Sequence, residues 1–113
     1  MTTTITAVGT DWDAIRMPRY LGLAAAAHLG DALGSVIVEP GERRMYVLVP
    51  PGTAGQWAVP DTHALGEDCY LPLPPASRSE PPGPYWLTPA YRWKLTDPDD
   101  LRSALTAASQ PPL

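Results

Sequence analysis

The chain contains no phenylalanine, no asparagine, one lysine and one cysteine. A single cysteine, Cys69, excludes both an intramolecular disulfide and a cysteine-based metal cluster. The longest apolar run is far too short to cross a membrane, and the opening MTTTITAVGT lacks the basic and apolar regions of a signal peptide. We therefore expect a cytoplasmic protein that does not contact a membrane.

Charged residues are also scarce, at 18% of 113 residues, and the net charge is −4. An acidic chain disfavours binding to a nucleic-acid backbone, which requires a cationic surface. The best candidates for a local basic patch are two pairs, Arg16 with Arg19 and Arg43 with Arg44. The scarce Lys, Phe and Asn have AT-rich codons, so this usage is typical of a high-GC, actinobacterial genome.

Apolar residues make up 44% of the chain, which is enough for one modest core. We therefore expect a single domain over residues 1–113. Residues 1–10 are rich in threonine and fit either a flexible tail or a short edge strand. The 15 prolines are about three times the average share, and proline-dense loops restrict the unfolded chain.

Two segments have the signals of helices. The first begins near Pro18, which suits the first helical position, and ends before Gly30 as a left-handed cap. Three- and four-residue spacing places one set of side chains on its buried face: Leu21, Ala24, Ala25, His28 and Leu29. Residues 11–16 before it are expected to form a separate turn in which Asp11 caps and Trp12 packs.

The second helix follows residue 96 and has the clearest local signal. Thr96 or Asp97 caps it, and Pro98 occupies its first turn. Asp99 and Asp100 then lie near the positive end of the helix dipole. The expected buried stripe consists of Leu101, Ala104, Leu105 and Ala108.

The strands are expected between these helices. Residues 36–38 and 45–49 predict a β-hairpin closed by a type II turn at EPGE, with Gly41 in the third position. Both runs are continuously apolar, which predicts central strands covered on two faces. Residues 50–68 are expected to be a long loop anchored by Trp57. The order of elements predicts an α+β fold: a small, mostly antiparallel sheet with a β-hairpin, packed by two helices.

The proline-dense segment CYLPLPPASRSEPPGPYW, residues 69–86, fits a linker, a polyproline ligand or a folded wall. We favour the folded wall. Pro72 should place the first strand of this segment at a sheet edge, where its missing N–H faces solvent. A short strand follows in PYWLTP, and YRWKL is either a fifth strand or the approach to the last helix.

The histidines, the cysteine and the serines are weak candidates for catalytic residues. His28 is expected to be a core or interface histidine. His63 lies beside Asp61 in a loop, and a single Asp-x-His is common by chance. Cys69 is expected to be a buried structural thiol, because no flanking motif supplies a base or an oxyanion site. Ser77 and Ser79 lack the context of a nucleophile elbow.

The carboxylates also have structural interpretations. Glu39 and Glu42 frame a turn, and Glu67 with Asp68 is a solvated loop pair, too few ligands for a divalent cation. There is no phosphate-binding loop and no dinucleotide fingerprint. We therefore assign no catalytic residue, no metal site and no cofactor.

Aromatic residues are the more informative group. Without phenylalanine, the four tryptophans and five tyrosines must supply the aromatic bulk of the core. Tyrosine and tryptophan also favour interfaces. Six residues near the C-terminus are candidates for an exposed binding platform: Tyr85, Trp86, Tyr91 and Trp93, beside Arg78 and Arg92.

One family resemblance covers residues 35–90. Tyr46 and Val47 lie in the hairpin, Gly66 follows, the run 70–73 ends in a proline pair, and Gly83 precedes Tyr85 and Trp86. In this order the chain resembles part of the bifunctional primase-polymerase family as it occurs in actinobacteria. The resemblance implies a palm hairpin.

In that family, catalysis uses paired aspartates on a palm strand to hold metal, and a histidine on the neighbouring strand. Here SVIVEP offers only Glu39, and RRMYVLV has no histidine. Because two-metal phosphoryl transfer needs several converging carboxylates, the resemblance implies a degenerate fragment with an inactive site.

We therefore expect a non-catalytic binding or accessory domain that acts on a protein partner, in a regulatory role. The alternative is a nucleotide- or metal-dependent enzyme remnant of primase-polymerase type, using Glu39, His63, Glu67 or Asp68. Self-association as a homo-oligomer, through the hydrophobic edge or the alanine-faced helix, is a third hypothesis.

Overall fold

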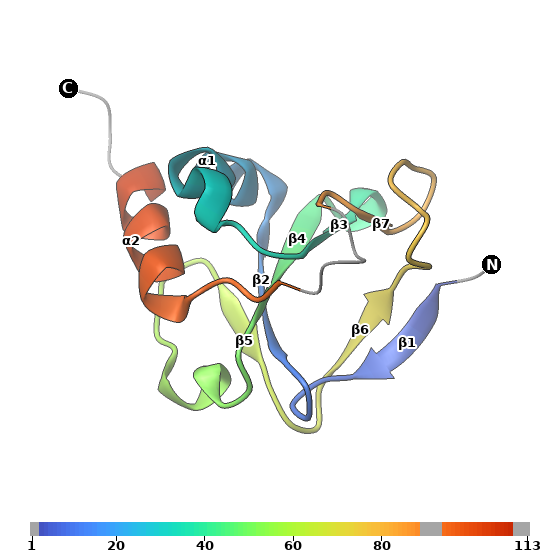
Figure 1. Ribbon diagram of the computed structural model, residues 1–113, viewed down its shortest axis with the longest axis horizontal. Helices are drawn as coiled ribbons and strands as arrows, with labels where there is room; N and C mark the ends of the chain where they lie inside the picture. The colour runs from blue at the N-terminus through green and yellow to red at the C-terminus, as the bar shows by residue number, and fades with distance from the viewer. Residues whose placement is uncertain (1–2, 89–93, 110–113) are drawn as a thin grey trace.

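The computed structural model describes residues 3–88 and 94–109, which form an α+β fold, as expected (Figure 1). The helices of this part are α1 (Arg19–Leu29) and α2 (Pro98–Ser109). Its strands are β1 (Thr4–Ala7), β2 (Asp13–Pro18), β3 (Val36–Glu39), β4 (Arg44–Val49), β5 (His63–Leu65), β6 (Tyr70–Leu73) and β7 (Tyr85–Trp86). Short 3₁₀ turns occupy Gly30–Ala32, Pro40–Glu42 and Thr53–Gln56.

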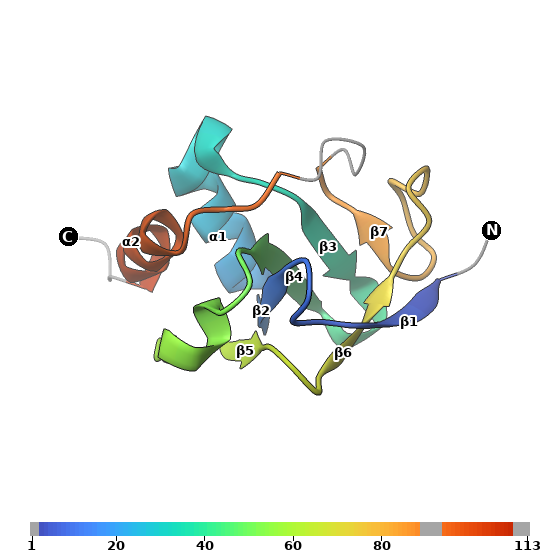
Figure 2. The same ribbon diagram turned by 60° about the horizontal axis from the view of Figure 1, so that its bottom comes forward.

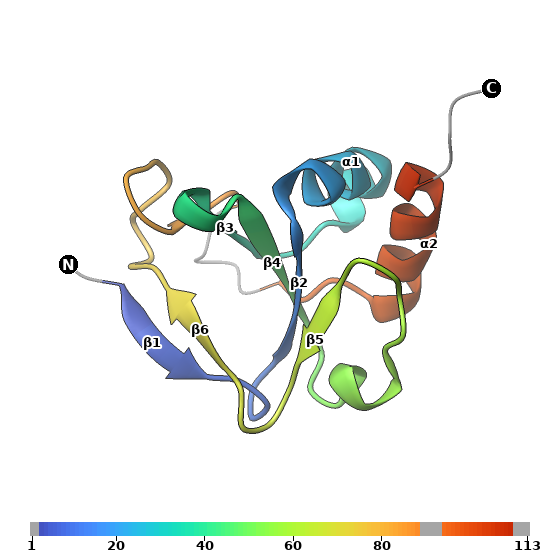
Figure 3. The ribbon, with the colours of Figure 1, turned by 180° about the vertical axis from the view of Figure 1, so that it is seen from behind.

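The strands form two antiparallel sheets. The larger has the order β5-β2-β4-β3-β7, and the smaller is a two-stranded ribbon of β1 and β6. Both helices lie together on one side of the larger sheet, and the β1–β6 ribbon projects away from them (Figures 1 and 2). Seen from behind, β5 forms the edge of the larger sheet beside β2 (Figure 3).

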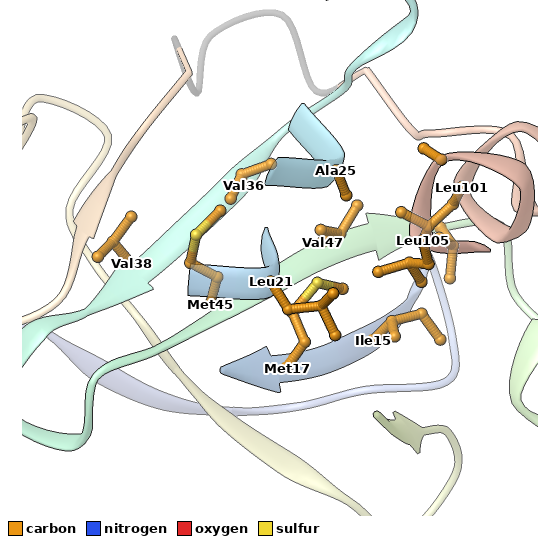
Figure 4. Close-up of a cluster of buried hydrophobic side chains, with 12 residues drawn as sticks. Ile15, Met17, Leu21, Ala25, Val36, Val38, Met45, Val47, Leu101 and Leu105 are labelled. Atoms are coloured by element: carbon orange, nitrogen blue, oxygen red, sulfur yellow. The ribbon is translucent and has the colours of Figure 1, made fainter. Parts of the chain in front are cut away.

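Both faces of the larger sheet are buried, which confirms the expectation from the continuous apolar runs. Successive side chains of a strand point to opposite faces. In β4, Met45 and Val47 therefore pack with Leu21 of α1 and Leu101 of α2, in what we call the helix-side core (Figure 4). The residue between them, Tyr46, packs on the other face with Leu48 of β4 and Leu71 of the ribbon, in what we call the ribbon-side core. The uniform apolarity of this hairpin thus reflects two cores rather than one.

The expectation of a turn over residues 11–16 is wrong, because Asp13–Pro18 forms β2, an interior strand between β4 and β5. Asp13 and Arg16 interrupt the apolar pattern that identifies a buried strand. Asp13 is only 2% exposed, and its Oδ2 accepts a hydrogen bond of 2.9 Å from the Ala54 N–H. A carboxylate can occupy this position because a distant turn supplies the donor, which no local pattern reveals.

Helix α1 ends before Gly30 as expected, but Gly30, with φ of 54° and ψ of −124°, does not take the left-handed helical conformation. Its buried face is rotated from the expected one, because Leu21, Gly22 and Ala25 are buried and His28 is exposed. The reason is a close approach to the sheet: a Cβ on Gly22 would lie 2.7 Å from the Met45 Sδ. The face of α1 that carries Gly22, and not the face that carries His28, therefore contacts the strands.

Helix α2 confirms the signals at its start. Asp97 Oδ2 accepts a hydrogen bond of 3.1 Å from the Asp100 N–H, so Asp97 is the cap. Leu101, Ala104 and Leu105 form the buried stripe. Thr96 is buried instead of capping, and its Oγ1 accepts a hydrogen bond of 2.8 Å from the Gly34 N–H.

Two expectations about loops need correction. The β3–β4 hairpin is not closed by a type II turn, because Arg43, with φ of 54°, takes the left-handed conformation in place of Gly41. The expected loop over residues 50–68 contains β5, whose three residues pair with β2. Trp57 anchors this region as expected, because it packs against the helix-side core. Its Nε1–H donates a hydrogen bond of 2.8 Å to Thr62 Oγ1.

The proline-dense segment is a folded wall. Leu71 and Trp86 are buried in the ribbon-side core, and the Trp86 Nε1–H donates to the Pro74 carbonyl at 3.2 Å. The Trp86 N–H donates to the Arg78 carbonyl at 2.9 Å, which closes the loop between β6 and β7. The two strand expectations in this segment correspond to β6 and β7.

Candidate functional site

Of the six residues expected to form an aromatic platform, three lie in the described part of the chain. Trp86 is 3% exposed, so its ring belongs to the core and not to an exposed platform. Tyr85, its neighbour on β7, is half-buried against the helix-side core on the opposite face of the strand. Arg78 is half-buried, and its Nη1 donates to Thr3 Oγ1 at 3.1 Å. Tyr91, Arg92 and Trp93 lie outside the described residues.

The residues of the alternative, enzymatic hypothesis stand on separate elements. Glu39 is on β3 and His63 on β5, with β4 and β2 between them. Three strand spacings correspond to roughly 14 Å. Glu67 and Asp68 are exposed in the turn before β6. Within residues 3–88 and 94–109, no group of three or more His, Cys, Asp or Glu side chains is placed to hold a metal ion.

The other single candidates are also apart from one another. His28 is exposed and lines an open hollow of about 380 Å³ between α1 and α2, together with Asp100 and Ser103. Cys69 is a free, half-buried thiol that packs at the edge of the ribbon-side core. Ser77 is exposed in the loop after β6.

Glu39 has a role that the turn interpretation missed. Its Oε1 accepts a hydrogen bond of 2.9 Å from the Tyr46 hydroxyl and forms an ion pair with the Arg44 Nε. The Arg44 guanidinium carbon also lies 5.8 Å from the centre of the Tyr46 ring. Three residues of the β3–β4 hairpin thus hold one another in a fixed arrangement.

This arrangement changes the acidity of Tyr46. Burial of the phenol, the hydrogen bond to Glu39 and the charge of Glu39 raise the pKa of Tyr46 to about 12, while Arg44 opposes the change. Tyr46 is therefore a neutral hydrogen-bond donor at physiological pH. It holds Glu39 in place rather than acting as a base.

Strand register places further polar side chains beside this cluster. Arg16 of β2 lies opposite both Tyr46 of β4 and His63 of β5. Pro18 lies opposite Arg44. The two arginine pairs noted in the sequence therefore meet at one end of the sheet, a convergence that no spacing in the sequence indicates.

The second prominent feature is an exposed apolar surface on the β1–β6 ribbon. Ile5 is 69% exposed and Tyr70 is 63% exposed. Ile5 lies opposite Pro72, and Ala7 lies opposite Tyr70. Because alternate residues share a face, these four side chains form what we call the outer face of the ribbon. Its inner face carries the buried Leu71.

The ribbon also leaves backbone groups open. The Val8 N–H donates to the Cys69 carbonyl at 3.0 Å, which identifies this pair as hydrogen-bonded. Hydrogen-bonded and non-hydrogen-bonded pairs alternate, so the N–H and C=O groups of Ile5 and Ala7 point away from β6. Pro72, opposite Ile5, has no N–H to present on its own outer edge. Of the two outer edges of the ribbon, only the β1 edge therefore presents both an N–H and a C=O group at each outward-facing residue.

The alternation in TITA and in YLPL was the signal in the sequence for this outer face. It was weak because four-residue patterns of this kind are frequent in loops as well.

No helix of the described residues has the length and apolarity needed to span a bilayer. No protein-family model, curated protein or solved structure matches the chain.

Proposed function

We propose that the chain is a non-catalytic accessory domain that binds a protein partner through the β1–β6 ribbon. The partner contributes an extended strand that pairs with the open edge of β1 and contacts the outer face. The observation that carries this proposal is the coincidence of an unpaired strand edge with Ile5 and Tyr70, each more than half exposed.

Open edges are usually protected, which makes the β1 edge informative. Native proteins block such edges with charged side chains, proline or bulges. Strand β1 has the sequence TITA, with no charge and no proline, whereas β6 carries Pro72. One edge of the ribbon is thus closed to pairing and the other is open. Strand addition uses backbone hydrogen bonds for affinity and alternate side chains for specificity.

A second exposed apolar pair is found on α1, where Tyr20 and Leu23 are 72% and 47% exposed. Unlike the β1 edge, a helix presents no row of unpaired backbone groups along its length. This pair offers side-chain contacts alone, so it is a weaker candidate than the ribbon. Leu23 of this pair supplies a control position for the experiment.

The test is affinity capture from an actinobacterial lysate with three forms of the chain. We expect the native chain and the control Leu23→Lys to retain the same protein, and the double variant Ile5→Lys, Tyr70→Lys to lose it. All three positions are exposed, so folding should be unaffected. Amide resonances of residues 4–7 should shift when the isolated partner is added to the labelled chain.

Two results would contradict the proposal. The first is equal capture by the native chain and the ribbon variant. The second is a concentration-dependent dimer in sedimentation that the ribbon variant abolishes, which would identify a second copy of the chain as the occupant of the edge.

A further inference from the structure

Half of the basic residues of this acidic chain meet at one end of the larger sheet. Of eight Lys and Arg residues, four are Arg16, Arg19, Arg43 and Arg44. Pro18 pairs with Arg44 across β2 and β4, and the Arg19 N–H donates to the Arg43 carbonyl at 2.8 Å. Like charges repel when they are brought together. This clustering of positive charge therefore carries an electrostatic cost.

A hollow of about 290 Å³ opens among these residues. Its charged and titratable lining consists of Arg16, Arg43, Arg44, His63, Asp61 and Glu42. They come from three strands and two turns far apart in the sequence. This volume lies at the small end of the range of ligand pockets, which suits a compact polar molecule.

The arginines of this hollow differ in their partners. Arg44 is held by Glu39, which in turn accepts a hydrogen bond from Tyr46. Arg16 is half-buried, and neither it nor Arg43 forms an ion pair with any carboxylate in the described part of the chain. Arg16 and Arg43 thus line the hollow without a carboxylate partner among the described residues. A half-buried charge gains most from a partner of opposite sign.

The backbone around the hollow is also unusual. Arg43 has φ of 54° and Asp61 has φ of 65°. Among the described residues other than glycine, only one more, Asp68, has a positive φ. Such conformations are uncommon, above all for a long side chain, and are found more often at functional sites. Two of the three therefore border one small hollow.

We infer that this hollow binds a small oxyanion, the phosphate or carboxylate group of a metabolite-sized ligand. The guanidinium groups of Arg16 and Arg43 bind the oxygens in their fork geometry, and Glu39 positions Arg44 beside them. Guanidinium groups match both phosphate and carboxylate with two parallel hydrogen bonds. Asp61 and Glu42 at the border accept hydrogen bonds from hydroxyl or amino groups of the same ligand.

The test is a titration of the isotope-labelled chain at constant ionic strength, followed through its amide resonances. Inorganic phosphate is the probe in one arm and succinate in the other. We expect saturable shifts at the end of β2, the start of β4 and residues 61–63. Saturation by phosphate alone supports a phosphate ligand, and saturation by succinate alone supports a carboxylate ligand.

Variants locate the binding. Arg16→Gln and Arg43→Gln should each weaken it at least about tenfold, the effect of losing one charged hydrogen bond. Arg102→Gln is the matched control, because Arg102 lies on α2 and pairs with Asp99. It should bind as the native chain does. Arg43 is exposed, so its variant should fold even if Arg16→Gln does not.

Three outcomes would overturn the inference. One is the absence of saturation with both probes. Another is an equal loss in Arg102→Gln, which would reveal only general attraction between charges. The third is unchanged affinity in Arg43→Gln while its fold is intact.

Discussion

Replacement of Gly34 by alanine should lower the stability of the protein, although glycine-to-alanine changes often raise it. Gly34 lies where residues 94–96 cross the end of the larger sheet. A Cβ at this position would collide with the Lys94 carbonyl oxygen and lie 2.9 Å from the Leu95 carbonyl carbon. These are backbone atoms, which cannot rotate away as a side chain can. Gly34 is not among the residues with a positive φ, so its own conformation permits alanine.

The magnitude follows from the hydrogen bonds that tie residues 94–96 to the sheet. The Ser35 N–H donates to the Lys94 carbonyl at 2.7 Å, and the Gly34 N–H donates to Thr96 Oγ1 at 2.8 Å. The Thr96 N–H donates to the Leu48 carbonyl at 2.9 Å. At about 1 kcal/mol each, loss of all three costs about 3 kcal/mol. Alanine restricts the unfolded chain more than glycine does, and this offsets about 0.4–1 kcal/mol of the loss.

We therefore expect Gly34→Ala to lower the free energy of unfolding by about 2 kcal/mol, a large part of a typical total of about 5–15 kcal/mol. Urea denaturation followed by tryptophan fluorescence measures the change. For a small domain, whose slope is about 2 kcal/mol per M, the midpoint should fall by about 1 M.

The control is Gly55→Ala, because a Cβ on Gly55 meets no atom within 4 Å and Gly55 has no positive φ. It should leave the midpoint unchanged or raise it slightly. The steric reasoning fails if Gly34→Ala is as stable as the native chain, or if Gly55→Ala loses as much.

Two further predictions concern ionisation and capping. Tyr46 should titrate near pH 12, so Tyr46→Phe should remove a step near this pH from the phenolate absorbance of the native protein. Glu39→Gln should lower the pKa of Tyr46 only in part, because burial is the largest cause of its increase. Since the folded-state pKa is raised from 10.0, the stability linked to Tyr46 is present below pH 10 and is lost as the pH rises towards 12, a loss that Tyr46→Phe should reduce. Asp97→Ala should cost about 1 kcal/mol in urea denaturation, because it removes the cap of α2. Asp99→Ala, which removes an exposed pair with Arg102 and one charge near the helix dipole, should cost less.

Several elements could be predicted from local chemistry. The start of α2 combines a capping aspartate, a proline and two further acidic residues, all of which act within one turn. Gly30 ends α1 with a positive φ, which glycine adopts without strain and without a tertiary partner. The hairpin strands were evident because both faces of β3 and β4 are buried, which leaves no polar residue to interrupt the pattern before Glu39.

Elements that depend on distant partners could not be predicted in this way. Strand β2 carries Asp13, whose burial is tolerated only because the Ala54 N–H donates to it. The exposure of His28 follows from the close contact of Gly22 with Met45, which decides the face of α1 that meets the sheet. Trp86 is buried because the ribbon covers the second face of the sheet.

The amino-acid sequence by itself determined the α+β class, the two helices, the central hairpin and the folded nature of the proline-dense segment, since each depends on short-range periodicity, caps or backbone restrictions. Only the tertiary structure decided which side chains meet. Antiparallel register brought Arg16 opposite Tyr46 and His63, and ribbon pairing left the β1 edge open beside Ile5. Such contacts join residues tens of positions apart, and their energies depend on strand order and register rather than on any local pattern.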